Sequence, residues 1–276
     1  MTTLPGSVTP HWLRLREPAD AVARSVRLVK SLRDALPDGQ TLEIHDIGCG
    51  SGSMGRWLAP LLPTSQRWVL HDRDPGLLEI ATSQPPRDGQ RSRLPVETAP
   101  GDLTGLTATD LARASLVTTS ALLDILTDDE LTVLVDLCVA VGCPALFTLS
   151  VTGVVRFFPP DPLDAELGAA FNDHQRRTVH GRSLLGPDAP RRTVELFVSR
   201  GAEVEVADSD WRVGAESREL AEEWLLGWVH AACEQRPELN RSAGAYLDRR
   251  REQLAHGLLE VTVAHADILA SPRRTG

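Results

Sequence analysis

Three glycines at alternate positions mark a place where a ligand could meet the main chain. Gly48, Gly50 and Gly52 directly follow a short apolar run that ends at Ile47. Glycine lets the backbone adopt positive φ and allows a ligand to approach it closely. Asp46, near the end of the same run, adds a carboxylate to this turn. The turn therefore combines bare backbone N–H groups with one anion, which is the chemistry of a site for a polar cofactor.

Two classes of cofactor use such a turn between a strand and a helix. Residues 50–55 fit the pattern G-x-G-x-x-G, in which backbone amides hold the pyrophosphate of a dinucleotide. Asp46 argues against that class, because a carboxylate repels a pyrophosphate and pairs with an ammonium group. An NAD(P)-dependent oxidoreductase remains the alternative interpretation.

Residues 46–52, Asp-Ile-Gly-Cys-Gly-Ser-Gly, closely resemble the glycine-rich first motif of class I S-adenosylmethionine-dependent methyltransferases. In that family the loop lies against the methionine and ribose parts of the cofactor. The resemblance implies S-adenosyl-L-methionine as cofactor, held by Asp46, Gly48, Cys49, Gly50 and Gly52. It covers residues 41 to 150 by motif, and the rest of the chain only by the order of elements.

Further cofactor contacts follow from the same resemblance. Asp72 lies 20 residues beyond the last glycine of the turn, where both nucleotide-binding classes place a carboxylate for the two ribose hydroxyls. Arg73 is its neighbour in this predicted cofactor wall. Asp102 and Leu103 resemble the motif that reaches the adenine amino group, and Ser120 begins the segment that passes beneath the sulfonium in the family.

Other side chains are candidates to contact the methyl acceptor. In the family, a segment before the first strand often folds over the cofactor pocket, so Trp12 and Arg14 are expected to reach substrate, together with their neighbours His11 and Arg16. An N-terminal arm that packs its tryptophan on the core is the alternative. Asp124 lies near a position where many relatives carry a histidine, and Phe171 begins a dense polar helical stretch.

Two histidines in this later region are candidate catalytic bases. His174 could accept a proton from an acceptor hydroxyl or amine, because the usual pKa of histidine is near neutral, and His180 is the second candidate. A polar surface helix that happens to carry a histidine is the alternative. Methyl transfer also proceeds by positioning alone when the acceptor is already nucleophilic.

The amino-acid composition limits the classes of partner that this protein could bind. The net charge of −9 and the pI of 5.4 disfavour a nucleic acid, whose binding depends on phosphate neutralisation. The four cysteines show neither a C-x-x-C pair nor the spacing of metal ligands, and no leader or long apolar run is evident. These features predict a cytoplasmic protein without a metal or a membrane segment that acts on a small-molecule acceptor, as in specialised metabolism. A non-catalytic protein that binds S-adenosylmethionine is a further alternative.

The elements that position these residues follow from apolar periodicity. The pattern predicts one α/β domain over residues 41–276, preceded by an arm and helix over residues 1–40. Predicted strands are 42–47, 66–70, 95–98, 114–119, 144–150, 202–206 and 258–265. Predicted helices are 18–36, 54–61, 76–82, 128–141, 161–177, 189–200, 216–235 and 239–255. With the resemblance, this order implies a doubly wound, mostly parallel seven-stranded sheet of the Rossmann-like methyltransferase fold. The helical element at 161–180 lies in the interval where the family commonly places acceptor-binding elements. The helical pair at 215–256 could supply a cap or the surface of a homodimer.

Overall fold

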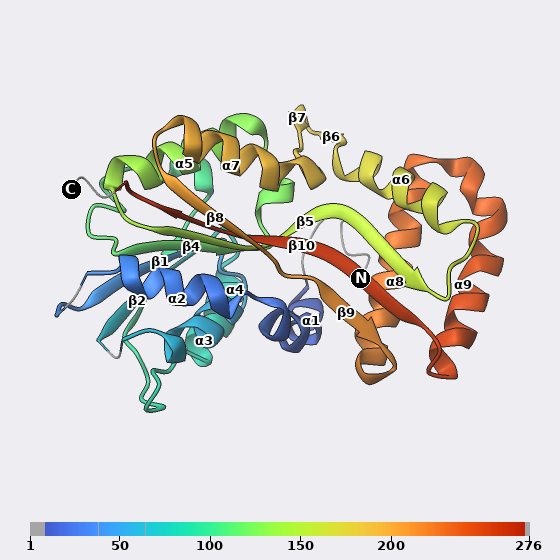
Figure 1. Cartoon of the computed structure of the whole chain (residues 1–276), viewed down its shortest axis with the longest axis horizontal. Helices are drawn as coiled ribbons and strands as arrows, with labels where there is room; N and C mark the ends of the chain where they lie inside the picture. The colour runs from blue at the N-terminus through green and yellow to red at the C-terminus, as the bar shows by residue number, and fades with distance from the viewer. Residues whose placement is uncertain (1–8, 38, 64, 274–276) are drawn as a thin grey trace.

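The computed structural model describes residues 9–37, 39–63 and 65–273, so residues 1–8 of the predicted N-terminal arm lie outside the described residues. Its main sheet has eight strands in the order β3-β2-β1-β4-β5-β10-β8, and β9 pairs with β10 off this path (Figure 1). The strands are β1 (Leu42–Ile47), β2 (Gln66–Asp72), β3 (Val96–Pro100), β4 (Leu116–Ser120), β5 (Ala145–Phe158), β8 (Glu203–Asp208), β9 (Trp211–Gly214) and β10 (Glu260–Ser271).

The direction of the strands confirms the predicted doubly wound sheet. The pairs β2–β3, β1–β2, β1–β4 and β4–β5 are all parallel. Only β10 runs against its neighbours β5, β8 and β9. The strand β9 is an addition that the apolar pattern did not predict, because it is only four residues long.

Helices cover both faces of the parallel part, which is why its strands are apolar on both sides. Leu32 of α2 shares one core with Ile44 of β1. Leu134 of α5 and Phe197 of α7 share a second core with Phe147 of β5. The helices are α2 (Val26–Ala35), α3 (Ser53–Leu58) and α4 (Pro75–Ser83) on one face, and α5 (Asp128–Val141) and α7 (Ala189–Ser199) on the other.

Strand β5 is much longer than predicted. It continues to Phe158 and pairs with β10 along its whole length, from Ala145 opposite Ala270 to Phe158 opposite Glu260. Leu149 has a φ of 57° within the strand, and β10 shows register shifts in the same region. Bulges of this kind bend a strand and increase its twist. The β5–β10 ribbon thus leaves the parallel sheet and carries β9 and a group of helices on its far half (Figure 1).

Those helices form a separate apolar cluster on the ribbon. Leu167 of α6, Trp228 of α8 and Tyr246 of α9 pack together in it. The elements concerned are α6 (Asp164–Gln175), α8 (Arg218–Gln235) and α9 (Asn240–Ala255), with the two-residue strands β6 (Thr178–Val179) and β7 (Arg182–Ser183) after α6. The predicted helical insertion before the last strand is therefore present.

The prediction of one N-terminal helix over residues 18–36 is wrong. The structure has α1 (Pro10–Ala23) and α2 with a break between them. The side chain of Thr9 accepts a hydrogen bond from the Trp12 N–H, so the helix begins before Pro18 and tolerates that proline inside it. Ser25 caps α2 in the same manner. In the described part of the chain, no helix is long and apolar enough to cross a membrane.

Candidate cofactor and acceptor site

The glycine turn has the backbone conformation that its sequence predicts. Gly48, Gly50 and Gly52 have φ values of 64°, 54° and 84°, which side-chain-bearing residues rarely adopt. A Cβ on Gly48 would lie 3.0 Å from Leu122, and one on Gly50 would lie 3.3 Å from Leu13 of α1. The turn is therefore closely packed, with α1 directly above its second glycine.

Asp46 is the most unusual carboxylate in this region. It is 0% exposed, and neither of its oxygens has a hydrogen-bond partner among the described residues. Burial raises the pKa of Asp46 to about 7, while the charge of Arg24 acts in the opposite direction. An unpaired buried carboxylate costs free energy unless a cation or donor binds to it. Asp46 is thus suited to receive a cationic group of a ligand.

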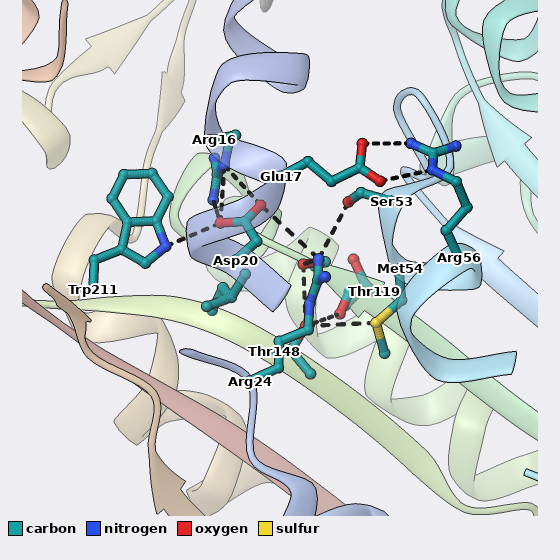
Figure 2. Close-up of polar contacts among 12 residues, drawn as sticks. Arg16, Glu17, Asp20, Arg24, Ser53, Met54, Arg56, Thr119, Thr148 and Trp211 are labelled. Atoms are coloured by element: carbon teal, nitrogen blue, oxygen red, sulfur yellow. Dashed lines mark hydrogen bonds and ion pairs between the residues drawn. The ribbon is translucent and has the colours of Figure 1, made fainter. Parts of the chain in front are cut away.

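Arg24 is the matching cation, and no sequence motif points to it. It is 2% exposed, and its Nη2 donates to Ser53 Oγ at 3.2 Å (Figure 2). The same Nη2 donates to Ser120 Oγ at 2.9 Å. Its Nε and Nη1 have no hydrogen-bond partner in the described part of the chain, and it forms no ion pair with Asp46 there. Hydrogen bonds between a guanidinium and a carboxylate are among the strongest that proteins use. Arg24 and Asp46 together offer one cationic and one anionic group to a ligand.

The junction between α1 and α2 holds Arg24 in place. Asp267 of β10 is buried, and its Oδ2 accepts a hydrogen bond from the Ser25 N–H at 2.7 Å. Its Oδ1 accepts from the Leu149 N–H at 2.8 Å, at the bulge of β5. One carboxylate therefore fixes the helix junction to the middle of the ribbon.

Two further contacts fix α1 over the site. Arg56 of α3 donates from Nε and Nη2 to the two oxygens of Glu17, each at 2.7 Å. One turn further along the helix, Asp20 accepts hydrogen bonds from Arg16 and from Trp211 Nε1, and lies 4.0 Å from Arg24 (Figure 2). The predicted N-terminal lid is thus bonded to both α3 and β9.

Asp72 lies beside the glycine turn, as the spacing predicted. Its Oδ2 accepts from the Gly50 N–H at 2.8 Å and its Oδ1 from the Asp74 N–H at 2.9 Å. Arg73 is exposed. The buried thiol of Cys49 has a pKa raised by burial, so it remains neutral at physiological pH. These hydrogen bonds show that Asp72 stabilises the glycine turn. Its role toward a ribose stays a prediction.

The predicted adenine-contacting pair lies on the surface near β3. Asp102 is exposed and accepts hydrogen bonds from the Thr104 N–H and hydroxyl, which lower its pKa. Leu103 is half-buried against the core that α5 and α7 share. These contacts stabilise the turn after β3, and the role of both residues toward adenine stays a prediction.

A cavity of about 400 Å³ lies between α1, the β5–β10 ribbon, α6 and α8. Its walls include four tryptophans and one phenylalanine. Ala121 and Leu149 contribute to them with φ values of 52° and 57°, and such strained backbone is concentrated at functional sites. The lining residues are Trp12, Arg16, Ala121, Asp124, Leu149, Val151, Phe171, Trp211, Glu223, Trp224, Gly227, Trp228, Val263 and His265.

The structure brings three of the predicted acceptor-contacting residues together in this cavity. Trp12, Asp124 and Phe171 all line it, although they come from three distant segments of the chain. Arg14 does not; its side chain bonds the exposed His11 instead. Arg16, the neighbour of these residues on α1, does line the cavity.

The two candidate catalytic histidines are not in the cavity. His174 lies on α6 with its Nε2 3.0 Å from Glu234 of α8. Burial lowers the pKa of His174, with Arg177 acting in the same direction. His180 is exposed in the turn between β6 and β7, with a φ of 51°. A catalytic role for either residue therefore has no geometric support in this arrangement.

The cavity does contain two other titratable groups that could accept a proton. Asp124 lies in the turn after β4, and burial raises its pKa to about 6. His265 of β10 is buried, which lowers its pKa to about 4 and keeps the ring neutral. Its Nδ1 donates to the Val263 carbonyl at 2.9 Å, so Nε2 is left as an acceptor. No sequence motif surrounds His265, because only the folded ribbon brings this residue to the wall of the cavity.

No protein-family model matches this sequence, and no curated protein matches it. Among solved structures, a cyclopropane synthase from Mycobacterium tuberculosis superposes with a TM-score of 0.53 at 11% identity, covering 96% of this chain and 95% of that chain. A methyltransferase from Geobacter sulfurreducens, solved with S-adenosyl-L-homocysteine, has a TM-score of 0.47 at 15% identity, covering 96% and 99%. The first likeness establishes the fold, which is the Rossmann-like methyltransferase fold. Within the described residues, no group of three or more histidine, cysteine or acidic side chains could hold a metal ion.

Proposed function

We propose that this protein transfers a methyl group from S-adenosyl-L-methionine to a small-molecule acceptor. The observation that carries the proposal is the pair of buried groups beside the glycine turn. Asp46 has two unpartnered oxygens, and Arg24 has unpartnered hydrogens on Nε and Nη1. The amino-acid end of S-adenosylmethionine carries one ammonium and one carboxylate. It would pair with both, and the desolvation cost of both groups would be offset.

The other residues of the turn fit the same cofactor. The glycine turn gives close access to the main chain, and Asp72 lies next to Gly50, where a ribose would follow the methionine part. When bound, S-adenosylmethionine supplies a methyl group on a positively charged sulfur, which is transferred without its bonding electron pair. A pyrophosphate would instead meet the carboxylate of Asp46, which disfavours a dinucleotide.

The chain's own residues would act by positioning the acceptor and excluding water. The aromatic walls of the cavity bury the acceptor next to Ala121, which directly follows Ser120 in the segment after β4. Asp124 and the Nε2 of His265 are the groups that could hold or receive a proton there. Holding the two reactants in line supplies much of the rate enhancement in such a reaction. A cavity of this size suits a free small molecule of the kind found in specialised metabolism.

Calorimetric titration of the purified protein with S-adenosylmethionine and with NAD tests the proposal. Wild type should bind S-adenosylmethionine, and Arg24→Met should bind it much more weakly. The matched control is Arg27→Met, because Arg27 lies nearby on α2 but is exposed and pairs with Glu205. Binding of NAD without S-adenosylmethionine would support the oxidoreductase instead. Cofactor binding without a methylated product from any acceptor would support a non-catalytic protein.

A further inference from the structure

The ionisable groups of the cavity give it a net negative character. Arg16 is the cation among them, but its Nε and Nη2 are already bonded to the two oxygens of Asp20, at 3.0 and 3.1 Å. His265 is neutral. The two carboxylates are Asp124 and Glu223, and Asp124 forms no ion pair with any described residue. A ligand that carries a positive charge would therefore meet an available counter-ion in Asp124.

The aromatic walls favour the same kind of ligand. The guanidinium of Arg16 lies over the ring of Trp211, 4.8 Å from its centroid, so a cation already occupies one indole face in this region. Trp12 lies 6.3 Å from Trp211, and Trp224 stacks on Trp228 at 5.7 Å. Indole rings attract cations through their quadrupole, most strongly where water is excluded.

We infer that the cavity binds an organic amine in its ammonium form, with the ammonium at Asp124 and the apolar body among the tryptophans. This inference rests on the proposed methyl transfer and names its acceptor class as amines. The cavity volume of about 400 Å³ suits an amine with an aromatic or similarly sized hydrocarbon body. The alternatives fit less well. A carboxylate or phosphate would face Asp124 and Glu223, and a neutral alcohol would leave the charge of Asp124 uncompensated.

The chemistry of an amine acceptor gives Asp124 a definite task. An ammonium nitrogen has no lone pair, so one N–H bond must break before methylation. Its electron pair stays on nitrogen, and the proton moves to an oxygen of Asp124, whose raised pKa makes it a better base than an ordinary aspartate. The nitrogen lone pair then supplies both electrons of the new N–C bond, and the sulfur keeps the pair of the broken S–C bond. The products are the methylated amine in its ammonium form, the neutral thioether of the cofactor and one proton, which is held on Asp124.

Tryptophan fluorescence can test the charge preference directly, since four of the six tryptophans line the cavity. The probes are 2-phenylethylamine, 2-phenylethanol and 3-phenylpropionate, which differ mainly in charge. We expect the amine to bind roughly tenfold more tightly than the alcohol, and the carboxylate to bind most weakly. Asp124→Asn should remove the preference for the amine. The matched control Asp129→Asn changes an exposed aspartate at the start of α5 and should keep it.

Each titration is made with and without S-adenosylmethionine, whose own binding is measured by calorimetry on the same samples. Equal binding of amine and alcohol, tighter binding of the carboxylate, or an unchanged preference in Asp124→Asn would overturn the inference. If S-adenosylmethionine binds while the preference is absent, only the acceptor class is wrong. If the preference is present but S-adenosylmethionine does not bind, the cavity selects amines and the proposed methyl transfer fails.

Discussion

Replacing Asp46 with asparagine should stabilise the protein without ligand and weaken its binding of S-adenosylmethionine. The reason is that Asp46 is fully buried without a hydrogen-bond partner among the described residues. Because its pKa rises from 3.8 to about 7, ionising it costs roughly 4 kcal/mol more in the folded protein than in the unfolded chain. An ammonium group bound at Asp46 would offset this cost, so the cost is present only in the protein without ligand.

The pH dependence follows from proton linkage. The pKa of Asp46 is 3.8 in the unfolded chain and about 7 in the folded protein. Between these two values the folded state holds the Asp46 proton more tightly than the unfolded state does. The free energy of unfolding therefore falls as pH rises through this window, by about 1.4 kcal/mol per pH unit, and the full cost is present above about pH 7. Asparagine does not titrate. The free energy of unfolding of Asp46→Asn relative to wild type should therefore increase by roughly 3 kcal/mol between about pH 5 and pH 8.

Urea denaturation of wild type and Asp46→Asn at the two pH values measures this shift. Any packing change caused by the substitution is the same at both pH values, so it cancels in the comparison. Asp248→Asn is the control, because Asp248 is exposed on α9 and should show no such shift. A stability difference that does not change with pH would refute the burial of an unpaired carboxylate at this position. An unchanged dissociation constant for S-adenosylmethionine in Asp46→Asn would refute its role toward the ligand.

Three further predictions concern the cofactor wall, the lid and the catalytic groups. Asp72→Ala should weaken binding of S-adenosylmethionine by about 1–3 kcal/mol, measured by calorimetry, because it removes a charged acceptor beside the turn; an unchanged constant would mean that the ribose lies elsewhere. Glu17→Gln should increase hydrogen exchange of α1, since it weakens the pairing with Arg56 that holds the helix over the turn; unchanged protection would show that apolar packing alone holds it. In assays with an amine acceptor, His174→Ala should change kcat by no more than about twofold. Asp124→Asn should lower kcat on the order of 100-fold, and the reverse pattern would restore His174 as the base.

Local sequence patterns predicted the parts of the site that lie within one turn or one strand end. The positive φ of Gly48, Gly50 and Gly52 and the position of Asp72 beside Gly50 follow from a strand, a glycine turn and a second strand in order. Such features depend on neighbouring residues and on the regular geometry of parallel strands. They were therefore accessible without a structure.

The residues that the sequence did not reveal depend on contacts between distant segments. Arg24 reaches the site because α1 and α2 break at Ser25, whose N–H is bonded to Asp267 of the last strand. His265 reaches the cavity because β5 continues beyond its predicted end and pairs with β10. Neither contact produces a periodic pattern in the local sequence. The lack of tertiary information also explains why the sequence favoured His174 as a catalytic base. Its polar neighbours resembled a site, but in the fold His174 contacts Glu234 and so connects α6 to α8.

A crystal structure of the protein with S-adenosyl-L-homocysteine would show whether Asp46 and Arg24 hold the amino-acid end of the ligand. We expect the ammonium of the ligand to bond to Asp46 and its carboxylate to bond to Arg24, with the ribose beside Asp72. A ligand whose amino-acid end binds away from both Asp46 and Arg24 would contradict it, as would a glycine turn that binds only a dinucleotide.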